Sequence, residues 1–320
     1  MRILDNYGIS KTGIETLTNA GFEVTSITVA QNQLINYINQ NSINIIIIGA
    51  NTIISSELIN VCPTLKVISC ASNNTNNIDI NYAINKGIQV INIQDANAVA
   101  VAELVFAHLL GMVRFLHQAN REMPLEGDTR FLDLKNQFST GTELRDKTLG
   151  IIGLGTIGKE VAKIAIGLGM KVIATSTSIK KETINISYFN GQSIAFEIET
   201  QALSSLLKNS DFITLHIPLQ ETPLIGKKEI ELMKTGAGII NTSQGGVLDE
   251  VALINGIESE KIKYAALDVF ESEQKPEIQL LMNPELSLTP NIAGITIESK
   301  LKTETELVLK IVSSKSKINI

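Results

Sequence analysis

The stretch Lys147–Ser178 limits the possible fold more than any other part of the sequence. It begins with a short apolar run, Thr148–Ile152, which is typical of a buried β-strand. The pattern Gly-x-Gly-x-x-Gly follows directly and leads into an amphipathic helix, Lys159–Leu168, and a second strand, Lys171–Ala174. A strand, a glycine turn, a helix and a strand in this order predict the first unit of a dinucleotide-binding domain.

The three glycines of this turn have separate physical roles. Gly153 permits the tight turn, Gly155 lets a pyrophosphate approach the backbone, and Gly158 lets the helix pack closely on the strand. The phosphates then lie over the helix N-terminus, where backbone N–H groups are free. We therefore predict dinucleotide binding here, with a purely structural glycine turn as the alternative.

Length, composition and charge limit the number of domains, the class of protein and the kinds of partner. A chain of 320 residues predicts about two domains, and 44% hydrophobic with 19% charged residues is typical of a globular protein. The net charge of -6 argues against nucleic-acid binding through a basic surface. Cys62 and Cys70 have no metal-site spacing, and so few thiols indicate a reducing compartment. Met1–Leu4 already reads as a strand, and Ile43–Ile54 is too short to span a bilayer, so we expect a cytoplasmic protein without bound metal.

The rest of the chain alternates strand-like and helix-like segments. Residues 1–96 contain five such pairs, and the alternation resumes after residue 147, which predicts two doubly wound parallel sheets of the α/β class. Ala98–Asn120 reads as one long buried helix, and Arg121–Asp146 as an extended arm or loop. The last helix, Thr296–Ser313, is amphipathic and is expected to return to the first domain. This predicts a discontinuous domain of residues 1–97 and 295–320, and a second domain of residues 98–294.

Several motifs beyond the glycine turn resemble one family, the NAD-dependent D-2-hydroxyacid dehydrogenases, and most closely its 3-phosphoglycerate dehydrogenase branch. The resemblance extends over nearly the whole chain. The matching stretches are NID at 77–79, VAEL at 101–104, GTELRDKTLGIIGLGTIG at 141–158, LHIPL at 215–219, NTSQGGVLDE at 241–250, AALDVFESE at 265–273 and TPNIAG at 289–294.

The resemblance implies a flavodoxin-like substrate domain at residues 1–97 and 295–320, and a Rossmann domain that binds NAD(P) at residues 98–294. It implies a homodimer and an oxidoreductase that acts on the CH–OH group of a D-2-hydroxy acid. The chain is expected to be a short form without a regulatory domain after Ile320.

The resemblance also locates three catalytic positions, of which only one keeps its expected residue. The family uses an arginine to hold the substrate, a histidine to move a proton and a glutamate to orient that histidine. These positions correspond to Gln244, Asn291 and Glu273. Gln244 cannot form a charge-assisted clamp on a carboxylate, and Asn291 cannot exchange a proton, so activity is expected to be reduced or shifted. Glu273 could act as the acid or base itself if burial raised its pKa, or it could merely hold a loop.

The expected cofactor and substrate contacts follow from the same resemblance. An acidic residue about 20 residues past the glycines normally binds the ribose hydroxyls of NAD. Ser176 stands there instead, followed by Lys180 and Lys181, which favours NADP slightly over NAD. The other expected cofactor residues are Thr156, Ile157, His216, Ile217, Pro218, Thr242, Ser243 and Asp268. Asn73 and Asn74 are expected to bind the substrate.

These observations leave three functions open. The first is an NAD(P)-dependent dehydrogenase of a small 2-hydroxy or 2-oxo acid. The second is a catalytically silent NAD(H)-binding protein that acts through a protein partner, which Gln244 and Asn291 favour. The third is an enzyme that uses Glu273 as its acid–base group on a different substrate.

Overall fold

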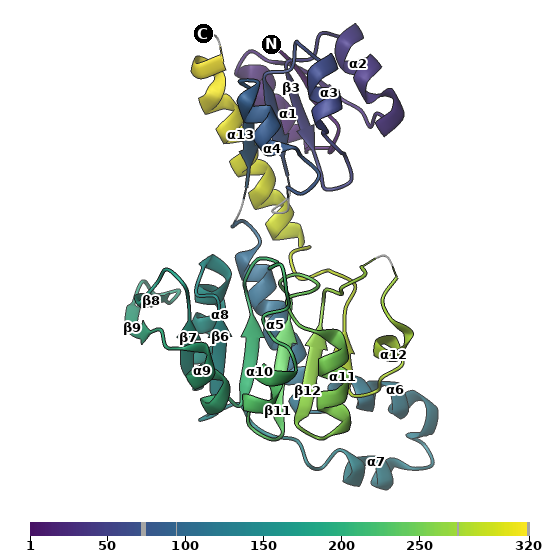
Figure 1. The fold of residues 1–320 in the computed structure, drawn as a ribbon, viewed down its shortest axis with the longest axis vertical. Coiled ribbons are helices and arrows are strands. Elements are labelled where there is room, and N and C mark those ends of the chain that lie inside the picture. Colours follow the sequence, from purple (N-terminus) through teal and green to yellow (C-terminus); the bar gives the residue numbers. More distant parts are fainter. Residues whose placement is uncertain (72–74, 94, 274, 319–320) are drawn as a thin grey trace. The chain divides into compact units, whose positions relative to one another are not determined.

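The computed structural model describes residues 1–71, 75–93, 95–273 and 275–318. The chain divides into two compact units (Figure 1). Unit 1 consists of Met1–Asn97 and Ile295–Ile320, and unit 2 of Ala98–Gly294. Each unit is built around a parallel sheet with helices on both faces, so the predicted fold class is confirmed.

Unit 1 contains a five-stranded sheet in the order β2-β1-β3-β4-β5. This is the strand order of flavodoxin-like folds. Its strands are β1 (Arg2–Asp5), β2 (Glu23–Ser26), β3 (Ile45–Ile48), β4 (Val67–Cys70) and β5 (Gln89–Asn92). Its helices are α1 (Lys11–Asn19), the 3-10 helix η1 (Gln31–Gln33), α2 (Leu34–Gln40), α3 (Ser56–Val61), α4 (Ile80–Asn85) and α13 (Ile297–Ile318).

Alternate residues of the unit 1 strands enter two separate cores, because successive side chains of a strand point to opposite faces. Ile46 packs in the core beneath α2, α3 and α4. Its neighbour Ile47 packs in the other core, with Leu17 of α1 and with Leu307 and Ile311 of α13. The last helix of the chain therefore completes one of the two cores of unit 1.

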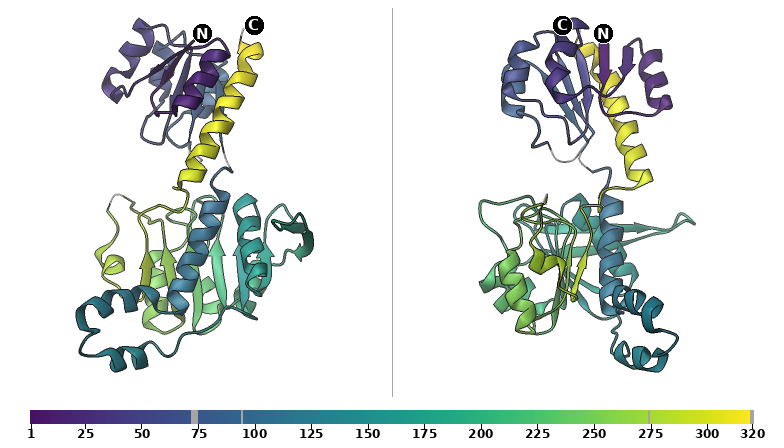
Figure 2. Two further views of the ribbon diagram at one scale, coloured as in Figure 1. Left: turned by 180° about the vertical axis from the view of Figure 1, so that it is seen from behind. Right: turned by 90° about the vertical axis from the view of Figure 1, so that its right-hand side faces the viewer.

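Unit 2 contains a six-stranded sheet in the order β13-β12-β11-β10-β6-β7, and every neighbouring pair is parallel. Its strands are β6 (Thr148–Ile152), β7 (Lys171–Thr175), β10 (Phe212–Leu215), β11 (Ala237–Asn241), β12 (Ile262–Leu267) and β13 (Leu286–Leu288). Its helices are α5 (Ala98–Val113), α6 (Leu116–Glu126), α7 (Phe131–Gln137), α8 (Thr156–Gly167), α9 (Leu203–Asn209), α10 (Lys227–Leu232), α11 (Glu250–Glu258) and α12 (Ile278–Leu281). Helices α5 and α8 contribute to the core on one face, and α9, α10 and α11 to the core on the other (Figure 2).

Beyond β7 this sheet lacks, among the described residues, the full outer strand that the Rossmann order 3-2-1-4-5-6 would place there. The outermost strand is reduced to a single parallel bridge between Ala174 and Thr200. The segment before it forms an antiparallel hairpin of β8 (Lys181–Ser187) and β9 (Ser193–Glu199), which lies at the β7 edge (Figures 1 and 2). This hairpin is not among the elements expected from the sequence.

Two sequence predictions for residues 98–146 were wrong. The expected single helix is broken where Phe115 adopts left-handed backbone angles, so α5 ends at Val113 and α6 begins at Leu116. The expected loop contains the rest of α6 and all of α7.

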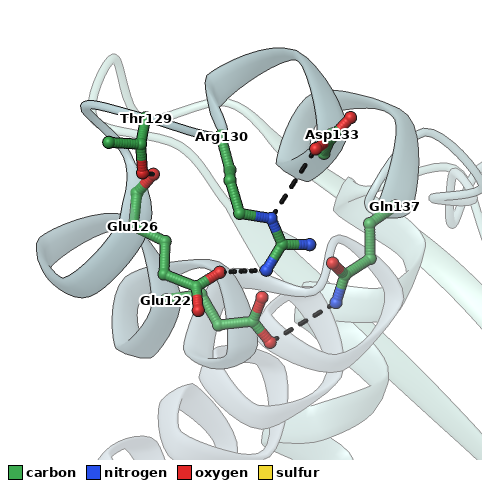
Figure 3. A network of polar contacts seen from close by, with 6 residues as sticks. All are labelled: Glu122, Glu126, Thr129, Arg130, Asp133 and Gln137. Carbon is green, nitrogen blue, oxygen red and sulfur yellow. Dashed lines mark hydrogen bonds and ion pairs between the residues drawn. The ribbon is translucent and has the colours of Figure 1, made fainter.

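Polar contacts join α6 to α7 (Figure 3). Arg130 pairs with Glu126 and, at 3.6 Å, with Asp133. Gln137 donates to Glu122 at 3.3 Å.

In the described residues no single helix is long and apolar enough to cross a membrane. Helices α5 and α6 together, bent by 56°, have the length and composition of a broken span.

Candidate functional site

Most of the predicted site residues of unit 2 follow the last residue of a strand. The carboxyl ends of parallel strands meet at one edge of a sheet, where α/β proteins bind their ligands. The glycine turn follows β6, Ser176 follows β7, and His216 follows β10. Thr242 follows β11 and Asp268 follows β12. The fold therefore gathers these residues at the same edge of the unit 2 sheet.

The glycine turn has the geometry of a phosphate-binding turn. Gly153 has a φ of 100°, which disfavours any side chain. A Cβ on Gly158 would lie 2.2 Å from the carbonyl oxygen of Gly153, whereas a Cβ on Gly155 would meet no atom within 4 Å. Gly155 is the N-cap of α8, and no side chain caps this helix, so its first N–H groups, which include those of Thr156 and Ile157, are available to an anion. The open space at Gly155 and these donors fit a pyrophosphate.

The loop after β7 is partly organised by Ser176. Its Oγ accepts hydrogen bonds from the backbone nitrogens of Ser178 at 3.4 Å and Ile179 at 3.2 Å. Of the two lysines that follow, Lys181 pairs with Glu197 on the hairpin at 2.8 Å. Lys180 has no ion pair among the described residues, so it is the lysine available to a ligand.

His216 is a neutral, half-buried histidine whose ring nitrogens lie inside the protein. Its Nε2 lies 2.9 Å from Oγ1 of Thr214, and burial lowers the pKa of His216 to about 3. Because the imidazole stays neutral near pH 7, it is not suited to exchange protons there. Two buried polar atoms, Nδ1 of His216 and Oγ1 of Thr242, have no hydrogen-bond partner in the described part of the chain. Unsatisfied buried polar atoms beside the predicted cofactor edge are consistent with a ligand that would satisfy them.

The loop that carries Gln244 is shaped by Asn241, a residue that the sequence analysis did not single out. The Oδ1 atom of buried Asn241 accepts from both N and Oγ of Ser243, and its Nδ2 donates to the carbonyl of Gln244 at 3.0 Å. The Oε1 atom of Gln244 accepts from the backbone nitrogen of Leu219 at 3.3 Å. The amide Nε2 of Gln244 therefore remains as a neutral donor.

Asn291 and Glu273 form a direct pair. Nδ2 of Asn291 donates to Oε1 of Glu273 at 3.0 Å, and both residues are exposed. Asn291 has a φ of 53°, a left-handed conformation that asparagine tolerates better than most residues. The structure thus contains an amide and a carboxylate in hydrogen-bond contact at an exposed position of unit 2.

Asp268 holds the loop that contains Asn291. Its buried carboxylate accepts from the backbone nitrogens of Ile292 at 2.9 Å and Ala293 at 2.8 Å, and its carbonyl oxygen accepts from the nitrogen of Asn291 at 2.7 Å. Thr289 also donates to this carboxylate, at 2.5 Å. Asp268 therefore sets the position of Asn291 through the backbone.

The Gln244 loop and the chain segment before Glu273 interlock through two glutamates that were not predicted as site residues. Glu250 accepts from the nitrogen of Glu271 at 2.7 Å, and Glu271 accepts from the nitrogen of Glu250 at 3.2 Å. A Cβ on Gly245 would lie 1.8 Å from the carbonyl oxygen of Phe270. Burial, followed by the charge of Glu271, raises the pKa of Glu250. Both glutamates lie in the motifs NTSQGGVLDE and AALDVFESE, but their mutual contact has no local sequence signal.

The substrate residues predicted in unit 1, Asn73 and Asn74, lie outside the described residues. The other predicted positions, Ile217 and Pro218, lie in the loop after β10 and are partly exposed or exposed at the sheet edge.

Comparison with known proteins identifies relatives over the whole chain. The family described as "D-isomer specific 2-hydroxyacid dehydrogenase, NAD binding domain" matches residues 106–293. A hydroxypyruvate reductase of Thermotoga maritima is 34% identical over 316 residues, which cover 97% of each chain. A D-3-phosphoglycerate dehydrogenase of Archaeoglobus fulgidus is 35% identical over 305 residues, which cover 94% of this chain but 55% of the relative.

A solved structure extends the likeness to three dimensions. An acyclic imino acid reductase in complex with NADPH and D-arginine superposes with a TM-score of 0.81 at 30% identity, covering 99% of this chain and 98% of the other. The comparisons give no support to the alternative of a catalytically silent binder.

The turn geometry predicts different outcomes for two alanine substitutions. Gly158→Ala should lower the free energy of unfolding by about 1–3 kcal/mol, because the new methyl group is forced against the Gly153 carbonyl. Gly155→Ala should leave the melting temperature nearly unchanged but weaken NADH and NADPH binding at least tenfold. Thermal melts and fluorescence titrations of both variants measure this. Equal loss of stability in the two variants would contradict the assignment.

Because the carboxyl group of Glu250 is buried, we predict that Glu250→Gln increases the stability of the protein in a pH-dependent way. A raised pKa means that the folded state binds its proton more readily than the unfolded state, so this group's contribution to stability falls as pH rises through that pKa. Glutamine keeps an oxygen for the Glu271 nitrogen and cannot ionise. The variant should melt at or above the wild-type temperature at pH 7, and the difference should shrink as pH falls toward 4.5, the ordinary pKa of a glutamate, and be absent below it. A variant that is clearly less stable at pH 7 would show that the ionised carboxylate is favourable.

Proposed function

The chain belongs to the family of D-isomer-specific 2-hydroxyacid dehydrogenases, and on that premise we propose that it is a nicotinamide-dependent oxidoreductase that interconverts a small 2-oxo acid and a D-2-hydroxy acid. Unit 2 binds the dinucleotide, and unit 1 contributes substrate contacts through Asn73 and Asn74. The observation that carries the proposal is the glycine turn, with open space at Gly155 and an uncapped helix N-terminus beside it. We also propose a cytoplasmic location, which the low cysteine content of the chain, Cys62 and Cys70, supports.

The protein's own residues would divide the work as follows. The turn from Gly153 to Gly158 holds the pyrophosphate, and the bound cofactor supplies the hydride. The Nε2 atom of Gln244, for which the described residues show no acceptor, binds a substrate oxygen without charge. Glu273 is in hydrogen-bond contact with Asn291, which stands at the position of the family's proton carrier. Because Asn291 cannot exchange a proton, Glu273 would transfer the proton, directly or through water, and turnover is expected to be slow.

We propose that NADPH binds more tightly than NADH. At the end of β7, Ser176 replaces the carboxylate that would repel a 2′-phosphate, and Lys180 is not engaged in an ion pair among the described residues. The imino acid reductase with similar structure was solved with NADPH, which supports the same preference.

A second candidate is the reduction of a 2-imino acid. A ketone that accepts a hydride must also gain a proton on oxygen, whereas a protonated imine becomes a neutral amine when it accepts the hydride alone. Asn291 cannot supply a proton, and Gln244 carries no positive charge that would repel a cationic imine, whereas Glu273 would attract one. The similarity to an imino acid reductase favours this candidate further.

We also propose that the protein forms a homodimer through α6 and α7. Large apolar side chains are exposed along these helices, and such a patch normally marks an interface. The exposed side chains are Leu116, Met123, Leu125, Phe131 and Leu132.

The proposed dehydrogenase activity is tested by measuring the oxidation of NADPH and of NADH in the presence of a panel of 2-oxo acids. The panel contains hydroxypyruvate, glyoxylate, 2-oxoglutarate and phosphohydroxypyruvate, each with and without ammonium. Slow oxidation of the cofactor that requires one of the 2-oxo acids is expected, with a lower KM for NADPH than for NADH. The double variant Gln244→Arg with Asn291→His should raise kcat/KM for a 2-oxo acid at least 100-fold. Oxidation that requires ammonium would identify the imine as substrate. No oxidation by either protein, with cofactor bound, would contradict the enzyme proposal.

Light scattering tests the dimer. Leu125→Asp with Leu132→Asp should convert the dimer to a monomer, because two buried charges would destabilise the interface. Ile278→Asp on α12 is the control, since Ile278 is 71% exposed but lies outside α6 and α7. A dimer that persists in the double variant would show that another surface joins the subunits.

A further inference from the structure

A buried histidine of α5 begins a chain of hydrogen bonds through unit 2. His108 is 5% exposed. Its Nδ1 lies 2.8 Å from Oγ of Ser287, and its Nε2 lies 3.0 Å from Oγ1 of Thr289. Thr289 donates to Oδ1 of Asp268 at 2.5 Å. Residues that are about 180 positions apart in sequence therefore form one continuous chain of hydrogen bonds between a buried histidine and a buried carboxylate.

The hydrogens of this hydrogen-bond chain can be arranged in only one way while His108 is neutral. Thr289 has a single hydroxyl hydrogen, which it gives to Asp268, so it must accept a hydrogen from Nε2 of His108. Nδ1 then carries no hydrogen and accepts from the hydroxyl of Ser287. Burial lowers the pKa of His108, which keeps the imidazole neutral near pH 7. The structure thus assigns the Nε2–H tautomer to His108.

The far end of the chain is the carboxylate that holds the Asn291 loop. Besides Thr289, Asp268 accepts from the backbone nitrogens of Ile292 and Ala293. A carboxylate with two rotatable bonds needs several donors to be fixed in one orientation, and the donor from Thr289 is itself oriented by His108. The hydrogen-bond chain ends at Asp268, which is fully buried. It therefore does not carry a proton to the solvent-exposed edge of the sheet.

An apolar side chain would fill the position of His108 at lower cost. Burying an imidazole and a serine hydroxyl is unfavourable unless both are hydrogen-bonded, and here each is paired with the other. Simple packing therefore does not account for the pair, whereas a role in orienting Asp268 does.

We propose that His108 is a positioning residue, which acts through Thr289 and Asp268 to hold the loop Asn291–Ala293 at the edge of the sheet where the nicotinamide end of the cofactor is reduced or oxidised. Its effect on cofactor binding rests on the proposed function, whereas its effect on the loop does not. Ser287 is part of the same device, because its hydroxyl can donate to the Nδ1 atom that this tautomer leaves without a hydrogen.

Three substitutions separate positioning from packing. His108→Leu fills the space without either hydrogen bond. His108→Gln offers an acceptor and a donor about as far apart as the two ring nitrogens, so it should restore the chain. His117→Leu is the matched control, because His117 is a second histidine of the same region whose buried Nε2 has no partner in the described residues and no link to Asp268.

Amide hydrogen exchange of the cofactor-free protein is the first readout. In His108→Leu, the amides of Ile292 and Ala293 should exchange about tenfold faster, while that of Ile213 in the central strand β10 stays unchanged. His108→Gln should return both rates to within twofold of the wild type, and His117→Leu should not alter them. Equal rates in His108→Leu and wild type would overturn the proposal, as would a uniform increase that includes Ile213.

Two further measurements complete the test. Long-range ¹H–¹⁵N spectra of the wild type should show the Nε2–H tautomer of His108, and Thr289→Val, which removes the acceptor at Nε2, should produce a mixture of tautomers. A wild-type Nδ1–H tautomer would overturn the proposal. Fluorescence titration should give a fivefold to tenfold weaker Kd for NADPH in His108→Leu and recovery in His108→Gln. Faster loop exchange in a protein that binds neither NADPH nor NADH would support the positioning role and refute the proposed function.

Discussion

The contact between Gly158 and the carbonyl oxygen of Gly153 is the constraint on which the geometry of unit 2 depends. Because no Cβ separates them, α8 begins directly against the turn that leaves β6, and its uncapped N–H groups point toward the carboxyl edge of the sheet. Every other strand of the sheet runs parallel to β6, so the loops after β7, β10, β11 and β12 reach the same edge. One missing methyl group thereby decides where a phosphate, and with it the whole dinucleotide, can lie.

The parts of the structure that were predictable from the sequence are those determined by neighbours in the chain. The glycine turn, the strand–helix alternation and the strand ends all have local patterns, and they predicted both sheets. The break at Phe115 has no such pattern, because its left-handed backbone accompanies a contact between the rings of Phe115 and Phe138, whose centroids lie 5.9 Å apart. The network around His108 was equally hidden, since its members come from elements that only the folded sheet brings together.

Gln244 and Asn291 stand where the family resemblance implies an arginine and a histidine. Asn291 donates to Glu273, and Gln244 lies in a loop that Asn241 shapes. Neither contact needs a titratable ring or a fixed positive charge. We therefore expect the fold to be stable with either pair of residues, so that stability and catalytic chemistry are separable at these two positions.

The participation of α13 in unit 1 has a consequence for the order in which the protein can fold during synthesis. Unit 2 is a continuous segment, complete once residue 294 has been made. Unit 1 begins first, yet one of its cores lacks Leu307, Val308 and Ile311 until the last helix is available. Domains generally fold as units while the chain emerges. Unit 2 can therefore fold completely before unit 1 does. During that interval, the apolar face of unit 1 that α13 will cover is exposed to solvent and to chaperones.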